Sequence, residues 1–403
     1  MSLLSIESAL EELLRDVSPI AEVEQLPLRM AAGRVLAADL VALRTQPDFD
    51  ASAMDGYALR AEDLTTGKPL RLMGISAAGR AFDGVLSSGE AVRIFTGAPL
   101  PAGADSVLIQ EDAERLEGDR VRASEPVEAG RNIRRAGNDF SEGATLLSQG
   151  FRLTAGMIAL AASGGHPRLP VLRRPRVAIL ATGDELVEPG EIVGPSQIVA
   201  SNSYGVAALV EANGGEVLDL GIAPDDLDEI GGRLDRAKSE GADIFVTIGG
   251  ASVGDHDLSA KAFESRGVSL DFWKVAMRPG KPIMAGRLGP MRIVGLPGNP
   301  ASSMVAATVF LRPLLRALAG LDSRAIYRHG RLGADMPAND HRAEFVRSTL
   351  RPIESGDLAE VHPLPRQDSS LLSIYAAAEV LLFRPANAPS ARAGSLCRFL
   401  PLD

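Results

Sequence analysis

A buried strand that runs directly into a glycine-rich turn constrains the fold of this chain more than any other feature. Residues 244–248 (IFVTI) form a largely apolar, β-branched run without a helical period, which is typical of a strand buried on both faces. Gly249, Gly250 and Gly254 follow, and a helical pattern begins near Leu258. A strand, a glycine-rich turn and a helix start form an anion site in open α/β sheets, because glycine lets the backbone approach a phosphate and free N–H groups point at it.

Two acids, Asp255 and Asp257, come directly after these glycines. They would repel a bare phosphate, so the stretch predicts an anionic ligand that is accompanied by a divalent cation such as Mg²⁺. The alternative is a tight strand-to-helix turn with two solvated acids, because glycine-rich turns are common in such sheets. These residues alone leave both interpretations open.

The strand–helix alternation extends over residues 171–322, which we expect to form one α/β domain. Strands are expected at 177–181, 216–221, 244–248, 268–276 and 291–295, and helices at 203–213, 226–239 and 300–319. The expected helix caps are Ser201 or Asn202, Asp225 and Asn299. Alternating strands and helices with short links predict a doubly wound, mostly parallel sheet.

The rest of the chain predicts three smaller parts, so the expected fold class is α/β and β multidomain. Residues 1–45 and 140–170 carry helical patterns, at 5–17, 26–40 and 153–162, and are expected to form a small helical or mixed N-terminal domain. Residues 46–139 contain short strands and turns, which predict a β-rich module inserted into that domain. Residues 325–403 predict a C-terminal β-barrel or sandwich.

Composition excludes several classes of function. Aromatic residues make up only 4% of the 403 residues and the net charge is −10, which argues against a base-stacking nucleic-acid surface and a general polyanion binder. The single cysteine, Cys397, excludes an internal disulfide and a cysteine metal site, and the five histidines lack metal-ligand spacing. No run reaches the ~18 apolar residues of a membrane span, and no targeting signal is visible. We expect a soluble, cytoplasmic protein without nucleic-acid or membrane partners.

Polar or glycine-rich loops follow the strands of the predicted parallel sheet, at 182–185, 224–226, 249–257, 274–281 and 295–299. Ligands of open α/β sheets bind outside the carboxyl ends of the strands, so these loops predict a site. They combine acids with bases, which suits a phosphorylated ligand held by Lys, Arg and Mg²⁺: Asp184, Glu185, Asp225, Asp255, Asp257, Lys274, Arg278 and Lys281. Acyl transfer is not indicated, because Ser252 has no obvious histidine and acid partners and His256 is expected at the surface.

Seven short motifs carry a family resemblance. They are FDASAMDGYA (49–58), IFTGA (94–98), NIRRAGND (132–139), TGDEL (182–186), GGASVGDHD (249–257), RPGKP (278–282) and GLPGNP (295–300). With these motifs in this order, the chain resembles the MoeA family of molybdopterin molybdenumtransferases, whose eukaryotic relatives are the gephyrin E-domains. The resemblance covers essentially the whole chain.

This resemblance implies insertion of molybdenum from molybdate into adenylylated molybdopterin, with release of AMP and with Mg²⁺. It also implies a homodimer of four-domain subunits, in which the α/β domain of one chain and the inserted module of the other share a site. Docking to the adenylyltransferase and to recipient molybdoenzymes is a further expectation of this kind.

Site residues are assigned partly by their position in the family's motifs and partly by the chemistry of their side chains. The resemblance supplies the six catalytic residues below together with Arg278, Lys281, Arg347 and Ser369, and the metal ligands, the other contacts and the individual roles are a physical hypothesis. The expected catalytic residues are Asp55, Thr96, Asp139, Glu185, Asp225 and Asp257, and the last three are the expected Mg²⁺ ligands. The expected substrate contacts are Thr182, Gly183, Asp184, Gly249, Gly250, Ser252, Gly254, Lys274, Arg278, Lys281, Pro297, Pro300, Arg347 and Ser369. Arg347 and Ser369 are the expected partners of molybdate, and Lys274, Arg278 and Lys281 those of phosphate and pterin oxygens.

The chain departs from the family pattern at several positions. Ala51 stands where asparagine is usual, Ala251 where valine is usual, and Arg278 where lysine is frequent, which keeps the charge but not the geometry. The segment that contains Ser369 matches the family only loosely.

Two other functions compete with this one. Molybdopterin adenylyltransferases and CinA-type nucleotide enzymes share the TGDE and GG loops, although the first 170 and last 80 residues argue against both. A carrier or scaffold that binds the pterin without turnover is the second alternative.

Overall fold

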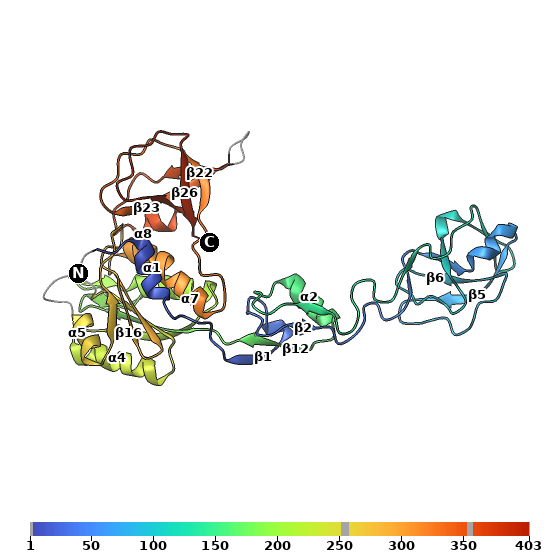
Figure 1. Ribbon diagram of the computed structural model, residues 1–403, viewed down its shortest axis with the longest axis horizontal. Coiled ribbons are helices and arrows are strands. Elements are labelled where there is room, and N and C mark those ends of the chain that lie inside the picture. The colour runs from blue at the N-terminus through green and yellow to red at the C-terminus, as the bar shows by residue number, and fades with distance from the viewer. Residues whose placement is uncertain (1–2, 251–257, 353–357, 403) are drawn as a thin grey trace. The chain divides into compact units, whose positions relative to one another are not determined.

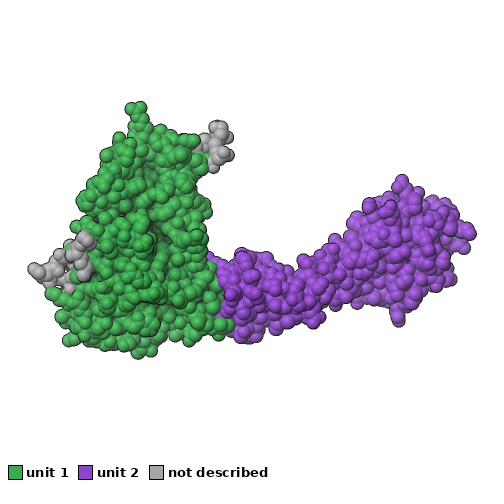
Figure 2. Space-filling view, viewed as in Figure 1, with its two compact units in different colours: residues 1–24, 33–35, 172–403 green, residues 25–32, 36–171 purple. Residues whose placement is uncertain are grey.

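The computed structural model describes residues 3–250, 258–352 and 358–402. The chain forms two compact units (Figure 2). The first unit contains residues 1–24, 33–35 and 172–403, and the second contains residues 25–32 and 36–171.

A six-stranded sheet forms the centre of the first unit, in the order β16-β13-β17-β21-β20-β18. The first four strands are parallel: β16 (Glu216–Ala223), β13 (Arg176–Thr182), β17 (Ile244–Ile248) and β21 (Met291–Leu296). β20 (Met284–Leu288) and β18 (Ser269–Phe272) continue the sheet as antiparallel strands. The predicted mostly parallel sheet is therefore confirmed, with an antiparallel edge that the strand–helix alternation did not indicate.

Alternate residues of each central strand enter two different cores, which explains the continuous apolar runs. On β13, Val177 and Ile179 pack with α1 (Ile6–Leu14), α3 (Ser201–Ala212) and the long helix that starts at Pro300. Ala178 and Leu180 instead pack with α4 (Leu227–Ser239) and α5 (Leu258–Ser265). Helices therefore cover both faces of the sheet (Figure 1).

The starts of these helices differ from the expected caps in a way that matters for the site. α4 is capped by Asp226, whose side chain accepts hydrogen bonds from the backbone nitrogens of Asp228 and Glu229. The predicted cap, Asp225, was wrong by one residue. The N-cap of α3 is Ala200, which has no capping side chain. Asn299 is the N-cap residue of α6 as predicted, with Pro300 directly after it, but its side chain makes no capping hydrogen bond. The side chains of Asp225, Asn202 and Asn299 therefore do not serve as helix caps.

The helix Pro300–Leu318 is long and apolar enough to cross a membrane, but 72% of its most apolar window is buried inside the protein, as in a core helix. It consists of α6 (Pro300–Ala306), a π-helical turn η4 (Ala307–Leu311) and α7 (Arg312–Leu318). Pro313 lacks an N–H group, and the wider turn before it accommodates its ring within one continuous helix.

Five strands close into a barrel near the C-terminus, which confirms the predicted β-barrel. They are β22 (Arg328–Leu332), β23 (Ala343–Arg351), β24 (Glu360–Pro363), β25 (Val380–Arg384) and β26 (Leu396–Pro401). The ring closes because β23 pairs with both β24 and β25. β19 (Met277–Arg278), which lies between β18 and β20 in the sequence, pairs in parallel with β23. The short helix α8 (Leu372–Ala376) precedes β25.

The second unit contains another six-stranded sheet, in the order β7-β4-β6-β5-β9-β8. Its strands are β4 (Gly56–Leu59), β5 (Leu70–Ser76), β6 (Glu90–Ile94), β7 (Ser106–Ile109), β8 (Ala113–Leu116) and β9 (Arg120–Ala123). Leu59, Leu70, Leu108 and Val121 are buried in its core. A β-rich module is therefore present in this part of the chain.

A smaller core in the second unit combines α2 (Ala155–Ser163) with buried leucines such as Leu36, Leu153 and Leu169. The expected helix at 26–40 is wrong: β1 (Val23–Pro27) leads into the 3-10 turn η1 (Leu28–Met30), and Gly33 follows with φ of 74°.

Short elements complete the structure: β2 (Leu40–Val41), β3 (Ala51–Ser52), η2 (Ala61–Thr66), η3 (Gln110–Asp112), β10 (Ile133–Arg134), β11 (Thr145–Leu147), β12 (Arg168–Leu172), β14 (Leu186–Val187) and β15 (Ile198–Val199). The division of the chain into four domains at the stated boundaries stays a prediction.

Candidate active site

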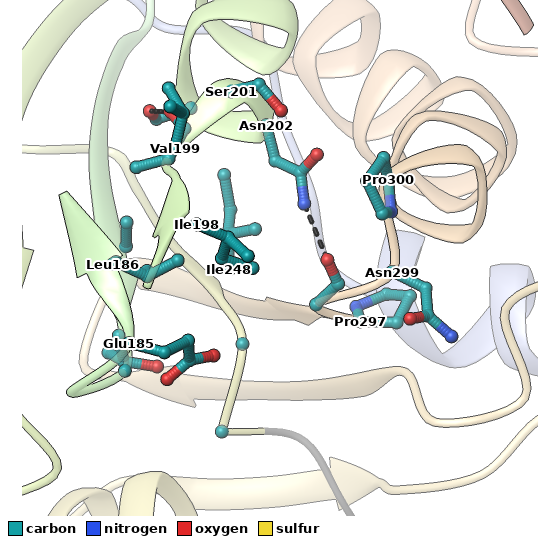
Figure 3. A pocket seen from close by; sticks show the side chains of 18 of the residues that line it. Glu185, Leu186, Ile198, Val199, Ser201, Asn202, Ile248, Pro297, Asn299 and Pro300 are labelled. Carbon is teal, nitrogen blue, oxygen red and sulfur yellow. Dashed lines mark hydrogen bonds between the residues drawn. The ribbon is translucent and has the colours of Figure 1, made fainter. Parts of the chain in front are cut away.

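A cavity of about 810 Å³ lies at the carboxyl ends of the parallel strands. It is lined by the loops that follow β13, β16, β17 and β21 and by the first residues of α3 and α6 (Figure 3). This is the location that the topology of an open α/β sheet favours for a ligand.

Many of the predicted substrate and catalytic residues line this large cavity. They are Thr182, Gly183, Glu185, Asp225, Gly249, Gly250, Pro297 and Pro300. Asp184 is adjacent, and its Oδ1 accepts a hydrogen bond from the backbone nitrogen of Asp225 at 3.1 Å. Ser252, Gly254 and Asp257 lie outside the described residues.

Two buried hydroxyl groups converge on the glycine turn. Thr182 is 3% exposed and Ser259 is fully buried, and neither hydroxyl has a partner among the described residues. A Cβ on Gly250 would lie 2.3 Å from Ser259 Oγ and 3.1 Å from Thr182 Oγ1, and Gly250 has φ of 62°. The turn therefore requires glycine both for its backbone conformation and for the close approach of these hydroxyls.

Carboxylates gather on one side of the large cavity. Partial burial, with the negative charges of Asp184 and Glu185, raises the pKa of Asp225. Carboxylate oxygens are the ligands that Mg²⁺ prefers, so the donor type suits the predicted metal. Within residues 3–250, 258–352 and 358–402, no three acidic, histidine or cysteine side chains converge closely enough to hold a metal ion.

The remaining wall of the large cavity is apolar. Leu186, Ile198, Val199 and Ile248 line it, and the first three come from the parallel pair β14 and β15 (Figure 3). Across from them, Asn202 Nδ2 donates a hydrogen bond to the backbone oxygen of Gly298 at 2.7 Å. Apolar walls with a few polar groups suit a planar heterocycle. Sequence reasoning missed these residues because strands of two residues carry no periodicity.

A second cavity of about 320 Å³ lies between the loop that contains β19 and the barrel. It is lined by Arg278, Pro279, Glu344, Phe345, Arg347 and Gln367. The pairing of β19 with β23 sets Arg278 opposite Glu344. This pairing brings the predicted residues Arg278 and Arg347 to one cavity, although they are far apart in the sequence.

Arg347 is fully buried, yet its guanidinium group is only partly paired. Nη2 donates a hydrogen bond to the backbone oxygen of Asp368 at 3.2 Å, whereas Nε and Nη1 have no partner among the described residues. Burial lowers the pKa of Arg347, but guanidinium stays charged in proteins. A buried, underpaired cation is costly, so this cavity suits an anion.

The segment 367–370 connects the small cavity to the large one. Gln367 lines the small cavity and Ser370 lines the large one. Between them, Ser369 accepts hydrogen bonds from Asn299 Nδ2 at its Oγ (3.1 Å) and from the backbone nitrogen of Ala301 at its carbonyl oxygen (3.0 Å). Ser369 therefore joins the barrel to the start of α6. Lys274 and Lys281 line neither cavity.

In the second unit, Asp55 and Thr96 form a preorganised pair. Oδ1 of Asp55 accepts hydrogen bonds from the backbone nitrogen and from Oγ1 of Thr96, both at 2.7 Å. These bonds, together with the nearby charge of Arg93, lower the pKa of Asp55. Asp139 is exposed and makes no contact with this pair; its backbone nitrogen donates to Gln46 O at 3.1 Å.

Comparison with known families covers nearly the whole chain. Residues 4–165 match the MoeA N-terminal region (domain I and II), residues 178–317 match a probable molybdopterin binding domain, and residues 329–402 match the MoeA C-terminal region (domain IV).

Curated relatives and a solved structure agree with these matches. A molybdopterin molybdenumtransferase of Haemophilus influenzae is 36% identical over 93% of this chain and 92% of its own length. Molybdopterin molybdenumtransferase 2 of Mycobacterium tuberculosis is 40% identical over 84% of this chain and 85% of its own. The crystal structure of the molybdopterin biosynthesis MoeA protein from Pyrococcus horikoshii superposes with a TM-score of 0.83 at 30% identity, covering 99% and 100% of the two chains. The chain therefore belongs to the MoeA family, whose curated members among these relatives are molybdopterin molybdenumtransferases.

Proposed function

We propose that this protein inserts molybdenum from molybdate into adenylylated molybdopterin and releases AMP, as a molybdopterin molybdenumtransferase of molybdenum cofactor biosynthesis. The relatives supply the reaction class. The observation in this chain that best supports the proposal is the underpaired guanidinium group of Arg347, which lines the small cavity next to the large one.

The two cavities suit the two substrates in their chemistry. Nε and Nη1 of Arg347, which have no hydrogen-bond partner among the described residues, are the donors to a tetrahedral oxyanion in this proposal. The large cavity has apolar walls for a planar ring and a glycine turn with the hydroxyls of Thr182 and Ser259 for phosphate oxygens. Gln367 lines the small cavity and Ser370, three residues later, lines the large one. Three residues of extended chain span at most about 11 Å, so the walls of the two cavities lie within that distance of each other at this segment. Molybdate is thus held near the heterocyclic substrate that receives the metal.

The charged loops have separate roles in this proposal. Arg278 and Arg347 attract the oxyanion, while Lys274 and Lys281 provide positive charge for substrate oxygens from outside the cavities. Ser369 positions the loop between the cavities through its contacts with Asn299 and Ala301.

Mg²⁺ is part of the proposal. Glu185 and Asp225 line the large cavity, and with Asp257 they would hold the cation. When bound, Mg²⁺ neutralises charge on the phosphoanhydride as AMP leaves. The raised pKa of Asp225 supports this assignment, because a cation would relieve the repulsion among these carboxylates.

Asp55 and Thr96, with Asp139, are proposed to act in a homodimer, where the second unit of one chain contributes to the site of the other. The lowered pKa of Asp55 supports an ionised carboxylate that binds a cation. A cytoplasmic location and docking to the adenylyltransferase and to recipient molybdoenzymes belong to the same proposal.

The reaction can be tested by incubating the purified protein with adenylylated molybdopterin and Mg²⁺, with and without molybdate, and by quantifying AMP by chromatography. We expect AMP release that depends on molybdate. Release without molybdate would instead indicate a nucleotide hydrolase, and tight binding without release would indicate a carrier or scaffold.

A further inference from the structure

The small cavity presents one hydrogen-bond acceptor among its donors. The side chain of Gln367 is held within the protein, because its Oε1 accepts from the backbone nitrogen of Arg347 at 3.0 Å and its Nε2 donates to the backbone oxygens of Arg347 and Leu364. The side-chain groups that remain are the guanidinium ions of Arg278 and Arg347 and the carboxylate of Glu344. An anion in this cavity therefore meets a carboxylate as well as two cations.

Glu344 uses only one of its two carboxylate oxygens within the protein. Oε1 accepts a hydrogen bond from Nε of Arg278 at 3.1 Å and forms an ion pair with Nη2 at 2.8 Å. Oε2 has no hydrogen-bond partner in the part of the chain that the structure describes, and the side chain is 18% exposed. Oε2 is therefore a largely desolvated hydrogen-bond acceptor at the wall of the small cavity.

The ion pair with Glu344 also reduces what Arg278 contributes to binding. Much of the charge of Arg278 is compensated by Glu344 and, at 3.7 Å, by Asp340. The electrostatic attraction of this cavity for an anion is therefore weaker than the attraction that two uncompensated guanidinium ions would exert. Recognition of an anion then depends more strongly on whether its oxygens match the donors of Arg347 and the acceptor of Glu344.

We propose that Glu344 makes this cavity selective for oxyanions that can carry a hydrogen, and that it discriminates against sulfate. The inference rests on the proposed function, because it concerns the same oxyanion cavity. An oxyanion held by Arg347 meets Oε2 of Glu344 with another of its oxygens. A hydrogen on that oxygen forms a bond, whereas two bare oxygens repel each other.

Sulfate is the relevant competitor because it shares the tetrahedral shape and the charge of molybdate. It is the anion of a strong acid and has no hydrogen at neutral pH. Phosphate still carries a hydrogen on much of its population at neutral pH. Molybdate is a bare dianion in neutral solution, but it is the anion of a weaker acid than sulfate, so it takes up a proton from solvent in the cavity at a smaller cost. A binding site rejects an analogue that leaves a desolvated acceptor of the site unpaired. Repulsion between that acceptor and an oxygen of the analogue adds to the specificity.

The test is calorimetric titration of the full-length protein with molybdate, phosphate and sulfate at neutral pH and constant ionic strength. Arg347→Met identifies the binding that belongs to this cavity. We expect wild type to bind molybdate and phosphate at least about tenfold more tightly than sulfate, given the cost of an unpaired buried acceptor. Glu344→Gln is expected to remove most of this preference, because its amide can donate to sulfate.

Asp340→Asn is the matched control. Asp340 also contacts Arg278 but does not line the cavity, so this variant is expected to keep the wild-type order of affinities. Wild type that binds sulfate as tightly as phosphate and molybdate would overturn the inference, whether or not the variants fold. A Glu344→Gln variant with a wild-type melting temperature and an unchanged preference would do the same.

The same titrations distinguish a failure of the proposed anion site at Arg347 from a failure of the proposed selectivity of Glu344. If Arg347→Met binds all three anions as wild type does, the cavity is not the anion site, and both the selectivity and the role of Arg347 in the proposed function are lost. If Arg347→Met loses binding while Glu344→Gln keeps the preference, only the selectivity of Glu344 is lost.

Discussion

Asp55 and Thr96 are joined by two hydrogen bonds to one carboxylate oxygen, from the backbone nitrogen and from the hydroxyl group of Thr96, each at 2.7 Å. Donors to the ionised form lower the pKa of Asp55. Oδ2 has no hydrogen-bond partner among the described residues. This pair therefore presents an ionised carboxylate with one free oxygen.

Removal of the Thr96 hydroxyl should shift the acid limb of the activity profile. In Thr96→Val the backbone donor remains but the side-chain donor is lost, so the pKa of Asp55 rises towards its ordinary value. Activity is then expected to fall at a higher pH than in wild type as the medium is acidified, while Thr96→Ser keeps the wild-type profile. The measurement is the rate of AMP release between acidic and neutral pH. Identical acid limbs in wild type and Thr96→Val would show that this hydrogen bond does not tune the reaction.

Replacement of Asp225 should abolish stabilisation by Mg²⁺. Wild type is expected to gain about 2.7 kcal/mol at a metal concentration one hundred times the dissociation constant, and Asp225→Asn much less. Thermal unfolding with and without Mg²⁺ measures this difference. Asp228→Asn is the control, because the side chain of Asp228 is 99% exposed at the start of α4. An equal gain in all three proteins would place the metal elsewhere.

The same variant has a pH-dependent effect without metal. Because the pKa of Asp225 is raised in the folded protein, the folded state holds its proton at a pH where the unfolded chain has released it. Stability is therefore lost as the pH rises from 3.8 through the raised pKa. Asp225→Asn should remove this loss and be more stable at neutral pH by a few tenths of a kcal/mol, a small value because the side chain is exposed to solvent. Denaturant titration at acidic and neutral pH provides the check.

Gly250→Ala should impair the site more than the fold. The φ of 62° costs about 1–2 kcal/mol for a residue with a Cβ, and that Cβ would displace Ser259 and Thr182. We expect AMP release to fall about 100-fold, as for a misplaced binding group. Gly267→Ala is matched in backbone conformation, with φ of 82°, but its Cβ meets nothing within 4 Å. It should lose similar stability and keep its activity; equal losses of activity in both variants would contradict the role of the turn.

Two buried arginines of the barrel should respond in opposite ways to replacement by methionine. Arg384 is 6% exposed and donates to the backbone oxygens of Pro337 and Pro389 at 2.6 and 2.8 Å, so Arg384→Met should destabilise the protein by about 3 kcal/mol. Two nitrogens of Arg347 have no partner in the part of the chain that the structure describes, so Arg347→Met should be close to neutral or stabilising in the absence of anion. Chemical denaturation of both variants measures this contrast, and an equally large loss in Arg347→Met would indicate a purely structural role.

The elements with long apolar runs could be predicted from sequence. β17 lies at residues 244–248 as expected, because both faces of that strand are buried and the run needs no alternation. The antiparallel strand β20 was not predicted. Gly289, with φ of 60°, reverses the chain within two residues, so β20 and β21 form a hairpin that departs from the strand–helix alternation. The segment 26–40 has apolar residues at helical spacing, but Pro27 and Gly33 divide it into a strand and a short turn.

The site was predictable where its residues belong to loops after strands. Thr182, Asp225 and Gly250 lie in the large cavity because parallel strands end at one edge of the sheet. Glu344 lies three residues before Arg347 in the sequence, but no role was predicted for it. Its position opposite Arg278 follows only from the pairing of β19 with β23. Long-range register of this kind leaves no local pattern.

The central claim is that the Arg347 cavity holds the molybdate that the reaction consumes. The most direct measurement is the rate of AMP release as a function of molybdate concentration for wild type, Arg347→Met and Arg384→Met. The KM for molybdate is expected to rise about tenfold or more in Arg347→Met, because bonds from a charged donor are lost, and to stay at the wild-type value in Arg384→Met. A wild-type KM for molybdate in folded Arg347→Met would contradict the account.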